Sequence, residues 1–172
     1  PSSRRSVLKR ALALSAVSAI PSFWPPAHGR VLPTSPLISA NDRVNIAFIG
    51  IGQRGGEIAK ELYNTGLCNV VALCDVDMGA PHTQEIINMF PKAARFQDFR
   101  TMFDRMADKI DAVSVGVPDH SHYPITIEAM AHGKHVYVEK PMARAVQEIE
   151  IMMRGAKKYG VVTQMCNQGH SE

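Results

Sequence analysis

Short apolar runs alternate with longer amphipathic segments from Arg43 to the end of the chain. Five runs, at residues 44–49, 70–74, 112–117, 135–138 and 161–165, are rich in Val and Ile and end near Gly, Asp or Pro. They are continuously apolar, as strands buried on both faces are, whereas a strand with one face in water alternates between apolar and polar residues. The runs therefore predict a parallel sheet that is covered by helices.

Helical periodicity fills the intervening segments, with helices expected at 56–65, 83–90, 99–106, 124–132 and 146–159. Pro124 suits a first helical turn, and Gly66, Gly133 and Gly160 stand where a C-terminal cap needs a positive φ. A strand followed by a helix, repeated along the chain, predicts a Rossmann-like α/β fold with a doubly wound parallel sheet. We expect one such domain over residues 43–172, preceded by a linker at 30–42 that is rich in Pro and Ser.

The first 29 residues combine a basic segment, SRRSVLK at 3–9, with a moderately apolar one, ALALSAVSAI at 11–20. This is the order of regions in a signal peptide. Arg4 and Arg5, followed by a Ser, an apolar pair and Lys9, resemble the twin-arginine consensus, with Val7 where Phe is commonest. The resemblance implies export of the folded protein to the periplasm by the twin-arginine machinery. The alternative is a tail with a chance arginine pair, in which case the protein is expected in the cytoplasm.

Charge and composition narrow the classes of partner. Four of the 19 Lys and Arg residues lie in the first 29 positions, whereas all 16 Asp and Glu residues lie beyond them, so the body of the chain is nearly neutral. A body with this balance gives no electrostatic reason to expect nucleic acid. No apolar run reaches the length of a membrane span. Cys68, Cys74 and Cys166 are odd in number, and Cys74 lies in an apolar run while the other two stand beside such runs, so we expect buried free thiols.

A glycine-rich loop, GIGQRG at residues 50–55, follows the first apolar run. Gly50 permits a tight turn, Gly52 allows the backbone to approach a pyrophosphate, and Gly55 lets the following helix pack against the strand. The helix N-terminus then presents N–H groups and a partial positive charge to phosphates. A preceding strand, a following amphipathic helix and a later acidic residue are the context that makes this motif specific. The loop predicts dinucleotide binding, with Gln53 and Arg54 among the contacts.

Asp75 supplies the acidic residue, 20 positions after Gly55 at the end of the second apolar run. Its carboxylate is placed to accept hydrogen bonds from a ribose diol, and it would repel a 2′-phosphate. NAD is therefore expected rather than NADP. Asp77 is interpreted as a turn or capping residue. Arg54 has two open interpretations, contact with the pyrophosphate or exposure to solvent.

Three further segments carry a resemblance to a known family: VPDHSH at 117–122, GKHVYVEKP at 133–141 and CNQGH at 166–170. Together with the glycine loop and Asp75, they resemble the N-terminal domain of the Gfo/Idh/MocA oxidoreductases, which include glucose–fructose oxidoreductase and inositol dehydrogenase. The resemblance covers residues 43–172, and the Glu-Lys-Pro segment is its most specific part. Val117 stands where Thr is common, and Cys166 where Gly often precedes Asn-Gln-Gly-His.

The resemblance implies a site at the carboxyl ends of the strands. It places Val117, Pro118 and His122 beside the nicotinamide half of the cofactor, and Glu139, Lys140 and Pro141 at the next strand end. The bond before Pro141 is often cis in this motif. Lys140 is the expected catalytic residue, because an ammonium group there can hold a substrate hydroxyl and stabilise its developing oxyanion. The alternative pairs Lys140 with Glu139 in a surface salt bridge.

The histidines give no metal prediction, because no carboxylate or cysteine spacing completes a ligand set. His120 is placed to contact substrate or nicotinamide, and His170 to line the same cleft, whereas His28 and His82 look incidental.

Three functions follow from these observations. The first is an NAD-dependent oxidoreductase acting on a sugar, polyol or related alcohol. The second is an NAD-dependent glycoside hydrolase of the same family, in which the cofactor is reduced and reoxidised within one cycle; the Glu-Lys-Pro segment, often missing from that branch, argues mildly against it. The third is a non-catalytic NAD-binding module. We expect this sequence to be a fragment that lacks the family's C-terminal α/β domain, with the complete protein a homo-oligomer.

Overall fold

The computed structural model describes residues 43–167. The predicted export signal (1–29), the predicted linker (30–42) and His170 lie outside the described residues, and the interpretations made of them stay predictions.

Strands and helices alternate along the described residues, as the apolar runs indicate. The elements, in chain order, are β1 (Val44–Ile49), α2 (Gln53–Asn64), β2 (Cys68–Cys74), α3 (Pro81–Met89), β3 (Ala94–Phe96), α4 (Phe99–Met106), β4 (Ala112–Val115), α5 (His122–Ala131), β5 (His135–Val138), α6 (Val146–Tyr159) and β6 (Thr163–Met165).

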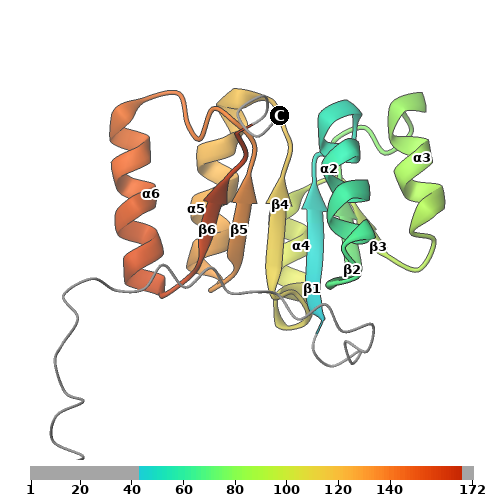
Figure 1. The fold of residues 1–172 in the computed structure, drawn as a ribbon, viewed down its shortest axis with the longest axis horizontal. Coiled ribbons are helices and arrows are strands. Elements are labelled where there is room, and N and C mark those ends of the chain that lie inside the picture. The colour runs from blue at the N-terminus through green and yellow to red at the C-terminus, as the bar shows by residue number, and fades with distance from the viewer. Residues whose placement is uncertain (1–42, 168–172) are drawn as a thin grey trace, which may run out of the picture. The chain divides into compact units, whose positions relative to one another are not determined.

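All strand pairs are parallel, and they form one six-stranded sheet in the order β3-β2-β1-β4-β5-β6 (Figure 1). The chain moves outward from β1 to β3, crosses back, and then moves outward again from β4 to β6. The direction of winding therefore reverses between β1 and β4, and in open sheets of this kind ligands bind at the carboxyl ends of the strands beside that reversal.

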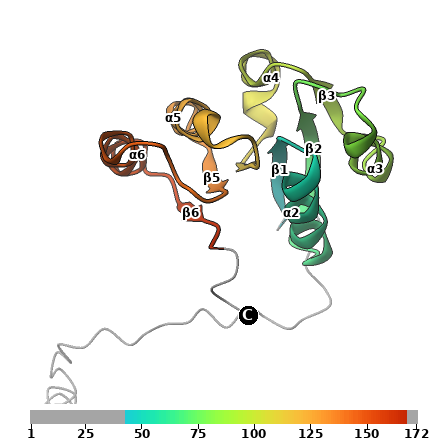
Figure 2. The ribbon, with the colours of Figure 1, turned by 90° about the horizontal axis from the view of Figure 1, so that it is seen from above.

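Helices cover both faces of the sheet, which explains why the strands are continuously apolar. On one face α4, α5 and α6 pack against the sheet around Met102, Phe103, Met130 and Met152. On the opposite face α2 and α3 bury a second cluster that includes Phe48 (Figure 2). The predicted Rossmann-like α/β fold is confirmed.

The ends of several elements differ from the sequence-based expectation, and local hydrogen bonds explain the differences. The helix expected from residue 56 begins at Gln53, inside the glycine loop. The last strand begins at Thr163 rather than at residue 161, because the Val161 N–H still bonds to the Ala156 carbonyl after the left-handed Gly160. The unpredicted β3 is a three-residue Ala-Arg-Phe segment with no apolar run, and its pairing with β2 makes it a strand.

Several local expectations are confirmed. Gly66, Gly133 and Gly160 have φ values of 70°, 71° and 66°, as helix-ending glycines do. Cys68, Cys74 and Cys166 are buried free thiols. Among the described residues, no helix is long and apolar enough to cross a membrane.

Candidate dinucleotide-binding site

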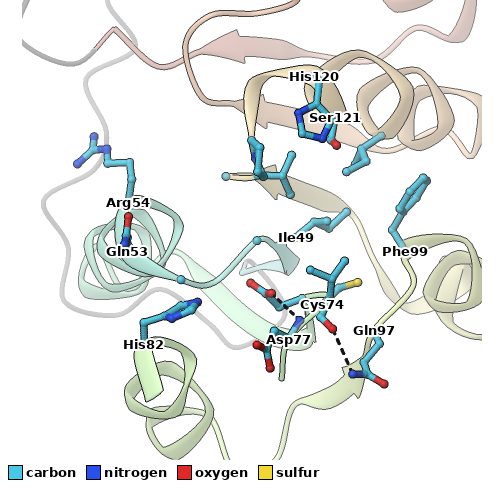
Figure 3. A pocket seen from close by; sticks show the side chains of 18 residues that line it. Ile49, Gln53, Arg54, Cys74, Asp77, His82, Gln97, Phe99, His120 and Ser121 are labelled. Carbon is cyan, nitrogen blue, oxygen red and sulfur yellow. Dashed lines mark hydrogen bonds between the residues drawn. The ribbon is translucent and has the colours of Figure 1, made fainter. Parts of the chain in front are cut away.

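A cavity of about 720 Å³ lies at the carboxyl ends of the strands, beside the reversal between β1 and β4 (Figure 3). Its size is within the range of small-molecule and cofactor sites, roughly 300–1,000 Å³. Residues that follow β1, β2, β3 and β4 line it, so segments far apart in the sequence meet there. Seven of the predicted cofactor contacts are among the lining residues: Gly50, Gly52, Gln53, Arg54, Asp75, Val117 and Pro118.

The other predicted contacts lie outside this lining. Gly55 is buried beneath the loop, and His122 is buried behind the strand ends. Glu139 is buried and Lys140 and Pro141 are exposed, all three at the end of β5. The structure thus brings the glycine loop, Asp75 and the β4 end together around one cavity, with the Glu-Lys-Pro segment just after the neighbouring strand β5.

The backbone at the glycine loop is so closely packed that side chains are excluded. Gly50 has a φ of 80°, and a Cβ there would lie 2.5 Å from the Gly116 carbonyl oxygen. A Cβ on Gly55 would lie 2.1 Å from the Gly50 carbonyl oxygen. Both contacts are to backbone atoms, which cannot turn away as a side chain can. The loop therefore packs closely against the end of β4 without side chains, with the N-terminus of α2 behind it, as the pyrophosphate-binding motif requires.

Gly116 belongs to this cradle, although the sequence analysis did not single it out. A Cβ on Gly116 would lie 2.7 Å from the Gly55 Cα. The Gly116 N–H also donates to the Ile49 carbonyl at 2.8 Å, which continues the β1–β4 ladder into the loop. Gly116 is far from the glycine loop in the sequence. Its role becomes visible only when β1 pairs with β4 and places Gly116 beside Gly50 and Gly55.

Asp75 is oriented by two backbone groups. One of its carboxylate oxygens accepts from the Ile51 N–H at 2.9 Å, and the other accepts from the Asp77 N–H at 3.0 Å. Each carboxylate oxygen can accept more than one hydrogen bond, so capacity remains for the ribose hydroxyls. These bonds tie the predicted ribose-binding carboxylate to the predicted pyrophosphate loop.

The cavity wall beside Asp75 is apolar and carries no ionised thiol. Burial is the main cause that raises the pKa of the Cys74 thiol, and the negative charges of the nearby Asp75 and Asp98 add to it. The resulting pKa is about 12. Cys74 is therefore a neutral thiol at physiological pH, and with Ile49 and Phe99 it gives the cavity an apolar side suited to a planar ring.

The Arg54 side chain of α2 forms an ion pair with Glu139 at the end of β5. Its Nε donates to a Glu139 carboxylate oxygen at 2.7 Å, and its Nη1 atom lies 3.0 Å from Glu57. The Glu139 side chain is only 6% exposed and its second oxygen accepts from the Lys140 N–H. The hydrogen bond to Glu139 is the main cause that raises the pKa of Arg54 above its ordinary value. The sequence left open whether Arg54 contacts the pyrophosphate or is exposed to solvent, and neither interpretation included this ion pair. Glu139 pairs with Arg54 rather than with Lys140.

His122 joins two of the segments that carry predicted site residues. Its ring is 1% exposed, with Nδ1 2.5 Å from the Pro141 carbonyl oxygen and Nε2 2.8 Å from the Val117 carbonyl oxygen. The loop after β4 and the loop after β5 are thus held together behind the cavity. The peptide bond between Lys140 and Pro141 is cis, as the family resemblance implies.

Several cavity-lining residues carried no functional prediction in the sequence: His82, Gln97, Phe99 and Ser121. His82 lies in the first turn of α3, Gln97 and Phe99 lie just before and at the start of α4, and Ser121 immediately precedes α5. His82, Gln97 and Phe99 stand in no binding motif, and Ser121 lies in the VPDHSH segment without an assigned role. The cavity arises only when the sheet assembles. Within residues 43–167, no group of three or more His, Cys, Asp or Glu side chains is arranged to hold a metal ion.

The parallel sheet, the glycine cradle and the oriented Asp75 define a dinucleotide-binding Rossmann domain. The family model described as "Oxidoreductase family, NAD-binding Rossmann fold" matches residues 44–166. The chain belongs to this family, the Gfo/Idh/MocA oxidoreductases, and NAD is the cofactor that its Rossmann domain binds.

The chain is also similar to curated proteins and to solved structures. A glycosyl hydrolase family 109 protein of Shewanella pealeana is 31% identical over 164 residues, covering 84% of this chain and 35% of that protein. An NAD-binding oxidoreductase of Klebsiella pneumoniae is 29% identical with a TM-score of 0.62, covering 72% of this chain and 34% of that one. The WlbA dehydrogenase of Thermus thermophilus, crystallised with NAD and UDP-GlcNAcA, shares the fold at 23% identity and a TM-score of 0.63, covering 71% and 41%. The chain spans about a third of the length of the curated relative.

Substituting Gly116 tests the cradle. We expect Gly116→Ala to displace the glycine loop and weaken NAD binding at least about tenfold, because the new Cβ meets backbone that cannot rotate away. Gly79→Ala is the matched control, since a Cβ there meets only the Asp77 carboxylate oxygen at an ordinary 3.6 Å. Calorimetric titration of both variants with NAD measures the effect. Equal affinities for the two variants would contradict the cradle.

The Arg54–Glu139 pair predicts a pH-dependent contribution to stability. Burial alone would raise the pKa of Glu139, but hydrogen bonds from Arg54 and the Lys140 N–H bring it below its ordinary value of 4.5. Because the carboxylate form is favoured in the folded state, this stabilisation is present above pH 4.5 and is lost as the pH falls further. We expect Glu139→Gln to lower the free energy of unfolding at pH 7 by about 1.5–3 kcal/mol, with a smaller deficit at pH 3.5.

Glu57→Gln is the control for this experiment, because Glu57 binds the same guanidinium but is 60% exposed. Exposed pairs contribute about 0–1 kcal/mol, so this variant is expected to stay near the wild type. Urea unfolding of the three proteins at both pH values measures the difference. A Glu139→Gln deficit that is independent of pH would show that the ion pair is not its cause.

Proposed function

We propose that the protein catalyses NAD-dependent hydride transfer from a CH–OH group of a carbohydrate. The observation that carries this proposal is the position of Lys140. Val115 at the end of β4 pairs with Val138 at the end of β5, and the Glu139 N–H continues the ladder to the Val115 carbonyl. The loop with Lys140 therefore starts beside the loop whose Val117 and Pro118 line the cavity.

The chemistry assigned to Lys140 follows from its charge and exposure. NAD⁺, held by the glycine loop and Asp75, would supply the hydride acceptor for oxidation of a substrate carbinol to a carbonyl. Lys140 donates a hydrogen bond to the substrate oxygen and stabilises the negative charge that develops as the hydroxyl proton leaves. The products would be the carbonyl compound, NADH and the hydroxyl proton, which passes to solvent water beside the exposed Lys140. Glu139 positions this residue through the bond that it accepts from the Lys140 N–H.

The substrate class has support from similar proteins. The Thermus dehydrogenase was crystallised with a sugar nucleotide, and another structure of this fold, at 21% identity, is a D-galactose-1-dehydrogenase of Rhizobium etli. We therefore propose a sugar or a related polyol as the substrate.

Substitution of Lys140 tests this role. In the natural full-length protein, Lys140→Met should lower turnover about 10²–10⁴-fold, the usual contribution of a positioned acid–base group. NAD affinity should change less than about threefold, since Lys140 does not line the cavity. The control is Lys157→Met, at an exposed position near the end of α6. Unchanged turnover of Lys140→Met would overturn the proposed catalytic role.

Glycoside hydrolysis is a second candidate, and the names of the curated relatives favour it. Such a reaction would use the same hydride abstraction and later return the hydride, so NADH would not accumulate. Product analysis separates the candidates: an oxidised sugar with one equivalent of NADH indicates the oxidoreductase, and a free sugar without net NADH indicates the hydrolase. NAD binding without either product would indicate the non-catalytic module.

A further inference from the structure

His82 lies at the predicted path of the pyrophosphate, although its sequence context gave no sign of function. It stands in the first turn of α3, is exposed, and lines the cavity (Figure 3). A Cβ on Gly52 would lie 2.4 Å from the His82 Cδ2 and 2.9 Å from its Nε2. The imidazole edge therefore packs against Gly52 of the predicted pyrophosphate loop.

The charges around this position leave the pyrophosphate without an obvious cation. Asp75 and Asp77 line the same part of the cavity and are acidic. Arg54 also lines it, but its guanidinium is held by Glu139 at 2.7 Å and Glu57 at 3.0 Å.

An ion pair also joins the two helices α2 and α3. Lys60 of α2 is held by Glu85 of α3 at 2.6 Å. Among the residues that line the cavity, this leaves the imidazoles of His82 and His120 as the remaining groups that can become cationic. Of the two, His82 is the one in contact with Gly52.

We propose that the protonated His82 imidazole donates a hydrogen bond to a phosphate oxygen of the cofactor and so contributes to NAD binding. The proposal rests on NAD occupying this cavity. A phosphate that approaches the open backbone at Gly52 comes within reach of Nε2, because the ring edge borders the same space. The positive imidazolium also offsets the repulsion between the phosphates and the carboxylates of Asp75 and Asp77. Because only the cationic imidazole makes this charge-assisted contact, the contact makes binding tighter at lower pH.

The test measures binding of ADP-ribose and adenosine by the 172-residue chain at pH 6 and pH 8. These ligands share the adenosine group, but only ADP-ribose carries the pyrophosphate. We expect wild-type protein to bind ADP-ribose about tenfold more tightly at pH 6 than at pH 8, consistent with a charge-assisted hydrogen bond. His82→Gln should lose this difference and leave adenosine affinity unchanged. The exposed Asn88 on the same helix provides the control variant, Asn88→Ala, which should behave as the wild type.

The possible results distinguish failure of the dinucleotide site from failure of the His82 contact. If the wild type binds no ADP-ribose, the dinucleotide site itself is wrong. If it binds but His82→Gln keeps the pH dependence, or if His120→Gln abolishes it instead, the role of His82 is overturned. An equal loss of adenosine and ADP-ribose affinity in His82→Gln would place the contact on the adenosine rather than on the phosphate, and would also overturn the proposal.

Discussion

The backbone contact between Gly50, Gly55 and Gly116 is the constraint on which the rest of the site depends. It brings the end of β1, the start of α2 and the end of β4 so close together that no Cβ fits between them. This contact places the helix N-terminus at the point where the winding of the sheet reverses. From there, hydrogen bonds extend outward, since Ile51 in the loop orients Asp75 and Arg54 in the same helix reaches Glu139. The cavity, the ribose-binding carboxylate and the Glu-Lys-Pro segment are thus parts of one connected arrangement.

That arrangement explains why buried charge is tolerated at the end of β5. Glu139 is nearly inaccessible to water, and an isolated carboxylate there would be costly. Arg54 and the Lys140 N–H satisfy both of its oxygens. The sequence suggested Glu139 as an ion-pair partner of Lys140. Glu139 instead connects Arg54 of α2 to the backbone N–H of Lys140, the proposed catalytic residue. The Lys140 side chain therefore lies outside this ion pair.

Much of the fold could be predicted because its determinants are local. Continuous Val- and Ile-rich runs, Gly66 and its counterparts at helix ends, and the glycine loop each report their structure within a few residues. The strand β3 could not, because Ala94, Arg95 and Phe96 become a strand through pairing with β2 rather than through their own pattern. The roles of Gly116, His82 and Arg54 were hidden for the same reason. Each depends on a neighbour far away in the sequence, and only the assembled sheet brings the two together.

The central claim is that NAD binds across the strand ends with its pyrophosphate over the glycine cradle. A crystal structure of this chain grown with NAD tests it most directly. The account predicts density for the pyrophosphate against Gly52 and for the adenosine ribose within hydrogen-bonding distance of Asp75. NAD bound elsewhere on the protein, or oriented with its phosphates away from Gly52, would contradict it.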